Sequence, residues 1–174
     1  LPLAIRSDNG APFASTGLAG LSKLSVHWMR LGIALERIRP GHPEENGRHE
    51  RMHRTLKCET ARPARTNLLQ QQERFDDFEV EFNHQRPHEA IDMKRPAELY
   101  ERSPRPYPSP LPEPSYPGHD DAVRVTREGT LRFRGRYLHL TAALAEQHVG
   151  LREEADGRWL VTFMHLDLGY ISTD

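Results

Sequence analysis

Two carboxylates stand where a metal-dependent reaction would need them. Asp8 follows the apolar segment LPLAIRS and opens the turn Asp8-Asn9-Gly10, at the end of a predicted strand, where open α/β sheets place their sites. Glu50 stands on a basic predicted helix, with Arg54 and Lys57 four and seven residues further on and therefore on its own face. Two such carboxylates can share a hard cation such as Mg²⁺. A turn aspartate beside a surface Glu50–Arg54 pair is the simpler interpretation of the spacing alone.

The same helix carries a second chemical pattern. The segment His49-Glu50-Arg51-Met52-His53 matches H-E-x-x-H, which puts two histidines on one helical face in zinc metalloproteases. A catalytic zinc needs a third ligand, for which only Glu73 or Glu79 offers itself, since no downstream histidine motif completes the pattern. Basic residues also suit phosphate contact better than an apolar protease cleft. On this helix they are Arg48, Arg51, Arg54 and Lys57.

Composition excludes several broad classes of protein. The 174 residues carry 24 Lys+Arg and 25 Asp+Glu, a net charge of −1, which excludes a uniformly basic DNA-coating protein but allows a local basic patch. The single cysteine, Cys58, excludes a disulfide framework and suits a reducing cytoplasm. Apolar runs are only a few residues long, so no membrane span is expected.

Periodicity and turn signals predict an α/β arrangement for the first hundred residues. Strands are predicted at 3–7 and 34–38, and helices at 14–31, at 48–60 and at 67–82, the last ending near residue 85 because a proline follows at 87. A short helix is predicted to begin at Pro96. Strand, helix, strand, helix, helix is typical of an α/β domain, and it begins too late to be a whole one.

The rest of the chain changes texture twice. Residues 103–118 hold seven of the fourteen prolines and predict an extended, semi-rigid linker. From about residue 121, alternating apolar residues predict short half-buried strands. Arg132, Arg134 and Arg136 alternate with apolar neighbours, so in one strand they would form a basic face that binds DNA by charge, or else an ordinary solvated face.

Three ordered motifs resemble a known family. They are SDNG at 7–10, GHPEENGRHERMHRTLK at 41–57 and FNHQRPHEAIDMKRPAELY at 82–100. Over residues 3–100 the chain resembles the second half of the integrase catalytic core, and especially bacterial insertion-sequence transposases. The resemblance implies an RNase H-like fold and an Asp, Asp, Glu triad that holds Mg²⁺ or Mn²⁺. Asp8 matches the second aspartate and Glu50 the glutamate. Arg54 and Lys57 match DNA-facing positions, and Arg51 joins them as a candidate.

The resemblance also implies what this chain lacks. The family's first aspartate lies on the opening strand of the sheet, but only seven residues precede Asp8 and none is acidic. We therefore expect a C-terminal part of such an enzyme that binds metal weakly or not at all and is inactive alone. The implied organisation is an incomplete RNase H-like core at 1–102, a proline-rich linker at 103–120, and an all-β domain at 121–174 that resembles the SH3-like barrel of these transposases.

The expected parent function is DNA transposition or integration by metal-dependent strand cleavage and transfer. The expected partners are DNA (transposon ends and target) and either a second copy of the chain or an intact transposase. The expected location is the cytoplasm, away from any membrane. Two alternatives stay open: a DNA-binding remnant that pairs with an intact transposase and regulates it, and a zinc metalloprotease built on the H-E-x-x-H segment.

Overall fold

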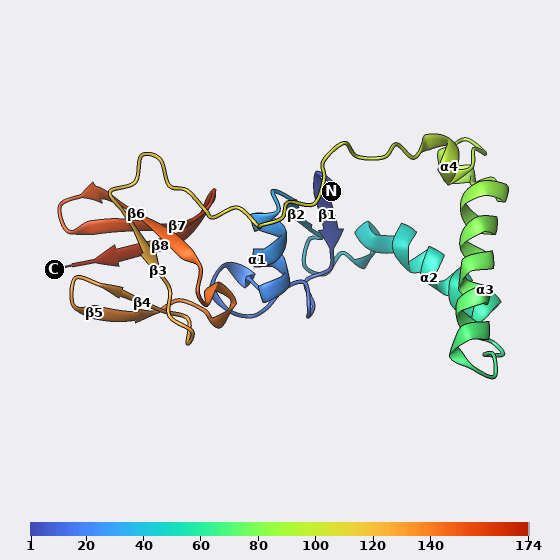
Figure 1. Ribbon diagram of the computed structural model, residues 1–174, viewed down its shortest axis with the longest axis horizontal. Helices are drawn as coiled ribbons and strands as arrows, with labels where there is room; N and C mark the ends of the chain where they lie inside the picture. The colour runs from blue at the N-terminus through green and yellow to red at the C-terminus, as the bar shows by residue number, and fades with distance from the viewer. Residues whose placement is uncertain (174) are drawn as a thin grey trace. The chain divides into compact units, whose positions relative to one another are not determined.

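A short parallel sheet precedes the Asp8 turn. The computed structural model describes residues 1–173 and groups the chain into two units, Leu1–Pro40 with Arg105–Asp174, and Gly41–Pro104. In the first unit, β1 (Ala4–Ser7) pairs in parallel with β2 (Ala34–Arg37). Parallel neighbours need a crossover, which here contains η1 (Leu18–Gly20) and α1 (Lys23–Arg30) (Figure 1). Both predicted strands are confirmed.

The crossover helix is shorter than predicted. Gly20, the last residue of η1, adopts φ +64°, so the helical conformation does not continue from η1 into α1. The helix then begins where Ser22 and Ser25 exchange hydrogen bonds between side chain and backbone in a capping box. Its end is as predicted, because Gly32, with φ +67°, follows the last turn in the left-handed conformation that suits glycine.

The C-terminal strands form two antiparallel sheets. One has the order β3 (Asp121–Arg124), β6 (His148–Ala155), β7 (Arg158–Phe163), β8 (Leu166–Ser172), and the other is the hairpin of β4 (Thr130–Phe133) and β5 (Arg136–His139). The short η5 (Ala142–Leu144) precedes β6. Across residues 1–173 the strands form three separate sheets, and none of these closes into a barrel. The SH3-like barrel therefore stays a prediction.

One hydrophobic core joins α1 to these sheets. Val26 and Met29 of α1 lie in the same buried cluster as Leu131, Leu151 and Phe163. Residues from both ends of the sequence are thereby held in one unit, which is why Leu1–Pro40 groups with Arg105–Asp174. The predicted division of the chain at residues 102 and 120 stays a prediction.

The predicted basic strand through Arg132, Arg134 and Arg136 is wrong. Arg134 and Gly135 have φ +46° and +79° and form the turn between β4 and β5. Two successive residues with positive φ are typical of tight hairpin turns. The run therefore folds back on itself, and Arg132 lies opposite Tyr137. The role of the three arginines in DNA binding stays a prediction.

The second unit is helical and has little core. It contains η2 (Pro43–Asn46), α2 (Gly47–Thr60), α3 (Leu68–Val80), a π-helical turn η3 (Glu81–Gln85), η4 (Glu89–Ile91) and α4 (Pro96–Leu99). The predicted helices at 48–60, at 67–82 and from Pro96 are confirmed. Among the described residues of this unit, only Thr60 and Phe78 are fully buried. No helix within residues 1–173 is both long and apolar enough to cross a membrane.

The proline-rich segment has no helix or strand, as predicted, but it is not a free spacer. At its start, Arg105 donates to the carbonyls of Leu31 and Gly32 at 2.8 and 2.9 Å, so it caps the end of α1. Further along, Arg30 of α1 donates to the carbonyl of Pro112 at 2.8 Å. The segment is thus hydrogen-bonded along the first unit, which contains it.

Tyr116 fastens the end of this segment to the four-stranded sheet. Its hydroxyl donates to the carbonyl of His148, and the ring of His119 lies 2.8 Å from the hydroxyl of Thr162. A Cβ added at Gly150 would lie 2.4 Å from Tyr116 and 2.6 Å from His119. The absence of a side chain at Gly150 therefore makes room for both rings on the face opposite the core.

The half-buried Tyr116 hydroxyl predicts a stability loss at high pH. Burial raises the pKa of Tyr116 above its usual value of 10, so folding favours the neutral phenol. This contribution is complete below about pH 10 and is lost as the pH rises through the folded-state pKa. We expect Tyr116→Phe to lower the free energy of unfolding by about 1 kcal/mol at pH 8. The variant should also lose less stability than the parent between pH 9 and 11.

Urea unfolding followed by the fluorescence of the buried Trp159 measures both effects. Tyr137→Phe is the matched control, since that ring is 68% exposed in the same unit and should change neither value. Parallel pH profiles for Tyr116→Phe and the parent would contradict the assignment.

Candidate functional site

Asp8 is held by one carboxylate oxygen and leaves the other open. Its Oδ1 accepts a hydrogen bond from the backbone N–H of Gly10 at 2.9 Å, which makes an Asx turn directly after β1. The side chain of Asn9 donates to the carbonyl of Ile38 at 2.8 Å and so ties the turn to the end of β2. Asp8 is exposed, and among residues 1–173 its Oδ2 has no hydrogen-bond partner. A fixed carboxylate with one open oxygen suits a cation ligand.

The charged row of α2 points away from its packing face. Glu50, Arg54 and Lys57 are exposed, whereas Met52 and Leu56 are half-buried. Spacings of four and seven residues place Glu50, Arg54 and Lys57 on one face of the helix, as predicted. Arg51 is also exposed but begins the next row round the helix. We call Glu50, Arg54 and Lys57 the α2 row.

The members of the α2 row do not neutralise one another. Within the described residues, no carboxylate lies within 4.0 Å of Arg54 or Lys57, and no cation lies that close to Glu50. The simple surface pair of Glu50 with Arg54 is therefore not formed. All three charges are turned to solvent and are available to a ligand.

Asp8 belongs to the first unit and Glu50 to the second, so the structure describes each carboxylate within its own unit. The structure brings together Glu50, Arg54 and Lys57 on α2. It separates Arg132, Arg134 and Arg136 between two strands and their turn.

The two histidines of H-E-x-x-H are adjacent but lack a third ligand. The rings of His49 and His53 lie 4.0 Å apart between centroids, as their spacing predicts. Across residues 1–173, no group of three or more His, Cys, Asp or Glu side chains is close enough together to hold a metal ion. Glu73 and Glu79 on α3 therefore do not complete a zinc site with this pair.

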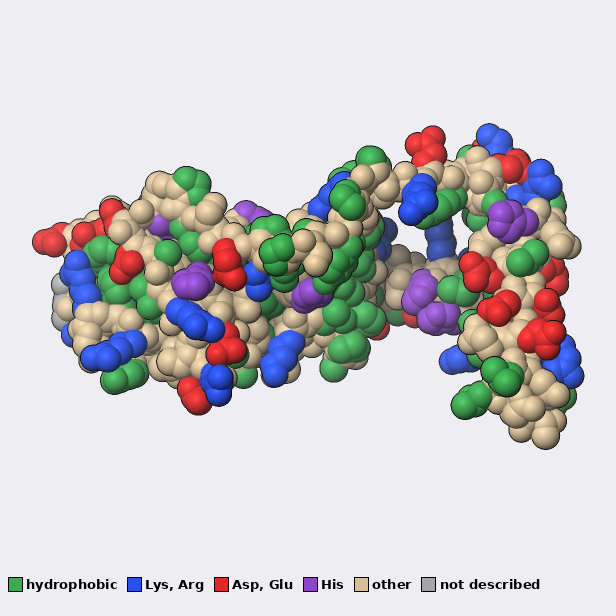
Figure 2. Space-filling model, in the orientation of Figure 1, with side chains coloured by type: hydrophobic (Ala, Val, Ile, Leu, Met, Phe, Trp, Pro, Cys, Tyr) green, Lys and Arg blue, Asp and Glu red, His purple; other side chains and the backbone are tan. Residues whose placement is uncertain are grey.

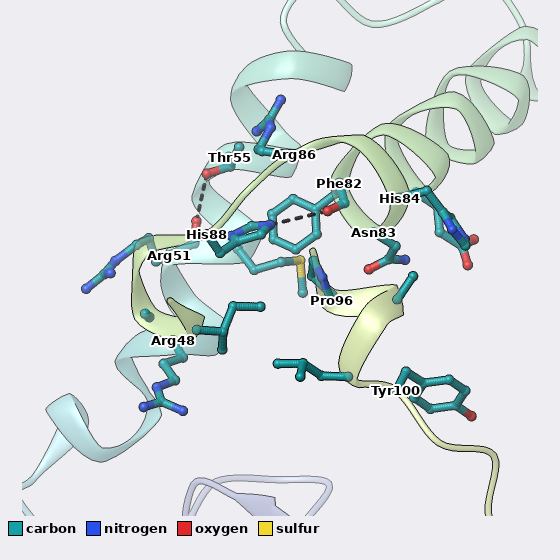
Figure 3. Close-up of a pocket in the computed structure, with 16 residues that line it drawn as sticks. Arg48, Arg51, Thr55, Phe82, Asn83, His84, Arg86, His88, Pro96 and Tyr100 are labelled. Atoms are coloured by element: carbon teal, nitrogen blue, oxygen red, sulfur yellow. Dashed lines mark hydrogen bonds between the residues drawn. The ribbon is translucent and has the colours of Figure 1, made fainter. Parts of the chain in front are cut away.

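A hollow of about 1000 Å³ lies beside α2 within the second unit (Figure 3). Met52, Phe82 and Leu99 give it an apolar lining, and Arg48 and Arg51 reach it from α2. The hollow thus combines apolar surface with the basic side of α2, but it does not include the α2 row.

His88, at the edge of this hollow, holds the turn between the helices together. Its ring lies 4.5 Å from the ring of Phe82, and its Nε2 is 3.2 Å from the carbonyl of that residue. Its backbone bridges to Lys94. These contacts give His88 a structural role in the turn between the helices.

Arg86 links α2 to the turn that follows α3. Its guanidinium donates to both carboxylate oxygens of Glu59 at 3.0 and 2.9 Å and to Glu81 at 2.5 Å. It also lies about 6 Å from the rings of Phe78 and Phe82. Hydrogen bonds to the two carboxylates raise the pKa of Arg86 above its already high usual value. Arg86 is therefore a structural cation.

Removing this cation should loosen the two helices. Arg86→Ala leaves Glu59 and Glu81 without their shared partner, so we expect a loss of about 1–2 kcal/mol in the unfolding free energy. The loss stays modest because the side chains of Arg86 and Glu59 remain 29% and 40% exposed. Arg86→Lys should recover only part of it, because an ammonium lacks the planar fork.

Hydrogen exchange of the α2 and α3 amides measures this loosening directly. Arg95→Ala serves as the control, since Arg95 pairs with Glu98 within three residues and joins no two long helices. Equal protection of α2 in the Arg86→Ala and Arg95→Ala variants would contradict the structural role.

The arginines of the β4–β5 hairpin lie against aromatic rings. The guanidinium of Arg134 is 4.5 Å from the ring of Trp159, and that of Arg132 is 5.7 Å from Tyr137. Arg136 instead donates to the carbonyl of Ser172 at 3.2 Å. Cation–π contact leaves the donor groups of a guanidinium free to bind a further acceptor.

Sequence reasoning missed one comparable contact. Arg158 stacks 3.9 Å from the ring of Tyr170, whose hydroxyl donates to Glu154. Arg158 of β7 and Tyr170 of β8 meet because of the register in which these two strands pair. Arg158 lies opposite Ser172, and Leu160 lies opposite Tyr170. The alternation within each strand was visible, but the register that joins the strands was not.

Residues 31–96 match the family model of the integrase core domain. The match includes β2, α2 and α3. It therefore contains the whole α2 row and also Arg51. Asp8 and the C-terminal strands lie outside it. An integrase core fits an RNase H-like fold, in agreement with the mixed α/β arrangement. Over this segment the chain is similar to the integrase core domain, which supports a place in the integrase and transposase superfamily.

Proposed function

We propose that this chain takes part in DNA transposition or integration and that α2 is its principal DNA-contacting element. The observation that carries the proposal is the α2 row, with an exposed Glu50 and two unpaired cations in the segment that matches the integrase core domain. In such a row the cations hold the phosphate backbone beside the carboxylate. Arg51, on the neighbouring row, is a further contact.

The charges of the neighbouring helix favour α2 as the DNA-facing side of the second unit. Acidic side chains gather along α3 (Figure 2). These residues are Glu73, Asp76, Asp77 and Glu79. A polyanion is repelled by such a surface and attracted to the basic one on α2. The contrast in charge between the two helices therefore favours α2, which bears the α2 row, as the DNA-facing element.

Asp8 and Glu50 are the proposed ligands of a divalent cation. Integrase-like core domains generally use divalent metals, and the carboxylates of Asp8 and Glu50 are hard donors that suit Mg²⁺ or Mn²⁺. Such ions activate an attacking hydroxyl and stabilise the leaving oxygen in phosphoryl transfer. Within the described residues no third metal-binding side chain joins either carboxylate in a cluster. We propose weak metal binding and little or no strand transfer by this chain alone.

The sheets of 121–173 complete the proposal as an accessory DNA-binding domain. The β4–β5 hairpin and the four-stranded sheet contribute to one core, through Leu131 and Phe163 among others, as two packed sheets of a small SH3-like barrel would. Arg132, Arg134 and Arg136 are its proposed DNA contacts. The proposed domains are 1–102 and 121–174, joined by 103–120.

Neutralising the α2 row should weaken DNA binding in a salt-dependent way. The double variant Arg54→Ala with Lys57→Ala removes two phosphate contacts. We expect its affinity for a 30-bp duplex to fall about tenfold at low salt, and the slope of log K against log[salt] to become shallower by about two. Fluorescence anisotropy at several salt concentrations measures both quantities.

A matched variant separates contact from net charge. Arg62→Ala with Arg65→Ala removes the same charge from exposed residues between α2 and α3. This control should keep most of the affinity. An equal loss in both double variants would mean that total charge, and not the α2 row, governs binding.

The carboxylates should be tested by metal binding and by strand cleavage separately. We expect Mn²⁺ to bind with a dissociation constant of about 1 mM or weaker. Glu50→Gln and Asp8→Asn should each weaken it further while leaving DNA affinity unchanged or higher, because a negative charge is removed. Electron paramagnetic resonance measures free Mn²⁺, and nicking of an end-labelled duplex measures chemistry. Unchanged Mn²⁺ affinity in both variants would refute the ligand assignment.

The same assays distinguish the alternative that the chain only binds DNA and thereby regulates an intact transposase. DNA binding that depends on the α2 row, together with no Mn²⁺-dependent nicking by the parent or by any variant, would favour that alternative.

A further inference from the structure

A second basic hollow lies within the first unit. It has a volume of about 430 Å³ and lies between α1 and the segment around η5. Lys23, His27 and Arg30 reach it from positions i, i+4 and i+7 of α1, and Arg127 reaches it from the turn after β3. One helical face therefore supplies three nitrogen-bearing side chains to a single concave surface.

Positive charge exceeds negative charge around this hollow. Glu146 is the acidic residue that lines it, and that carboxylate already binds Arg127 at 3.2 Å and Arg124 at 3.5 Å. Glu113 reaches Arg30 only at 3.8 Å and is itself 76% exposed. The lining thus holds three formal cations, Lys23, Arg30 and Arg127, and one carboxylate, so an anion is attracted to the hollow.

Arg30 forms the fixed back of the hollow. Its side chain is only 14% exposed, and one guanidinium nitrogen is held by the carbonyl of Pro112 at 2.8 Å. Its Nε is buried and has no hydrogen-bond partner among the described residues. Because this N–H has almost no solvent-accessible surface, Arg30 acts on an occupant of the hollow through the fixed positive charge of its guanidinium.

The remaining lining limits the size of the ligand. Ala142, Ala143 and Ala145 on and after η5 present only methyl groups, which leaves room without adding specific contacts. No Phe, Tyr or Trp side chain lines the hollow, and His27 is the one ring in it on which a base could stack. A lining of this kind suits phosphate groups rather than a nucleoside.

We propose that this hollow binds phosphate groups and that its occupant is the backbone of the DNA strand. The hollow would then be a second DNA contact in addition to the α2 row. The phosphate chemistry stands on the hollow itself, whereas DNA as its source rests on the proposed function.

The test uses two probes, inorganic pyrophosphate and a 30-bp duplex, with the full chain. Lys23→Ala with Arg127→Ala removes the two exposed cations and leaves the structural Arg30 in place. We expect the pyrophosphate dissociation constant from calorimetry to rise at least tenfold. The duplex affinity should fall about threefold to tenfold at low salt, with a salt slope shallower by about two.

Arg152→Ala with Arg158→Ala is the matched control, because it removes two cations from the same unit outside the hollow. It should leave pyrophosphate binding unchanged. The fluorescence of the buried Trp159 checks that each variant is folded.

The outcomes separate the two proposals. Loss of pyrophosphate binding with unchanged duplex affinity would overturn DNA as the occupant and leave a free-phosphate site. Unchanged binding of both probes would overturn the hollow as an anion site, even if the α2 variants still lose DNA affinity. Loss of both probes on changing the hollow, with no effect of the α2 row, would support the hollow and count against the α2 proposal.

Discussion

The core shared by α1 and the C-terminal sheets is the constraint on which the first unit depends. Val26 and Met29 are covered by side chains that include Leu151 and Phe163, from strands made of the last residues of the chain. Each such fully buried side chain contributes about 1.5–3 kcal/mol, so this contact outweighs any single surface ion pair. It sets the position of α1, and α1 in turn forms the crossover of the small sheet that ends at Asp8. The basic hollow exists because the same packing holds α1 against η5.

The second unit is built on a different balance. With only Thr60 and Phe78 fully buried among its described residues, it relies on polar links between α2 and α3. Arg74 donates twice to the carbonyl of Glu59, and Arg86 grips the carboxylate of the same residue. All of these links meet at the C-terminal end of α2. The first two turns of α2, which include Glu50, make none of these links, and their charged side chains stay available to a ligand.

Local patterns in the sequence predicted what local forces decide. The α2 row could be predicted because its spacing needs only helical geometry, and the end of the long helix could be predicted from Pro87. The hairpin turn at Arg134 and Gly135 was missed, although a glycine between alternating apolar residues is the usual local signal for it. The break between η1 and α1 was missed as well, since one helix was predicted over 14–31 although Ser22 and Ser25 offered a capping box.

Other features could not be predicted from local patterns at all. The packing of Tyr116 over Gly150, and the meeting of Lys23 with Arg127 at one hollow, depend on contacts between residues far apart in the sequence. The role of Arg86 likewise depends on Glu59, which lies 27 residues earlier in the sequence. Only the packed structure reveals Arg86 as a structural cation.

The shared core also sets the order of events during synthesis. The apolar face of α1 leaves the ribosome long before Phe163, a member of the same buried core, has been translated, since the two lie more than a hundred positions apart. At about 5–20 residues per second, that interval is roughly 7–30 seconds. Through this interval the core around α1 lacks the side chains that β7 contributes. The nascent chain therefore completes this core only after Phe163 has left the ribosome, with Val26 and Met29 incompletely covered, and so open to chaperones or to other nascent copies, until then.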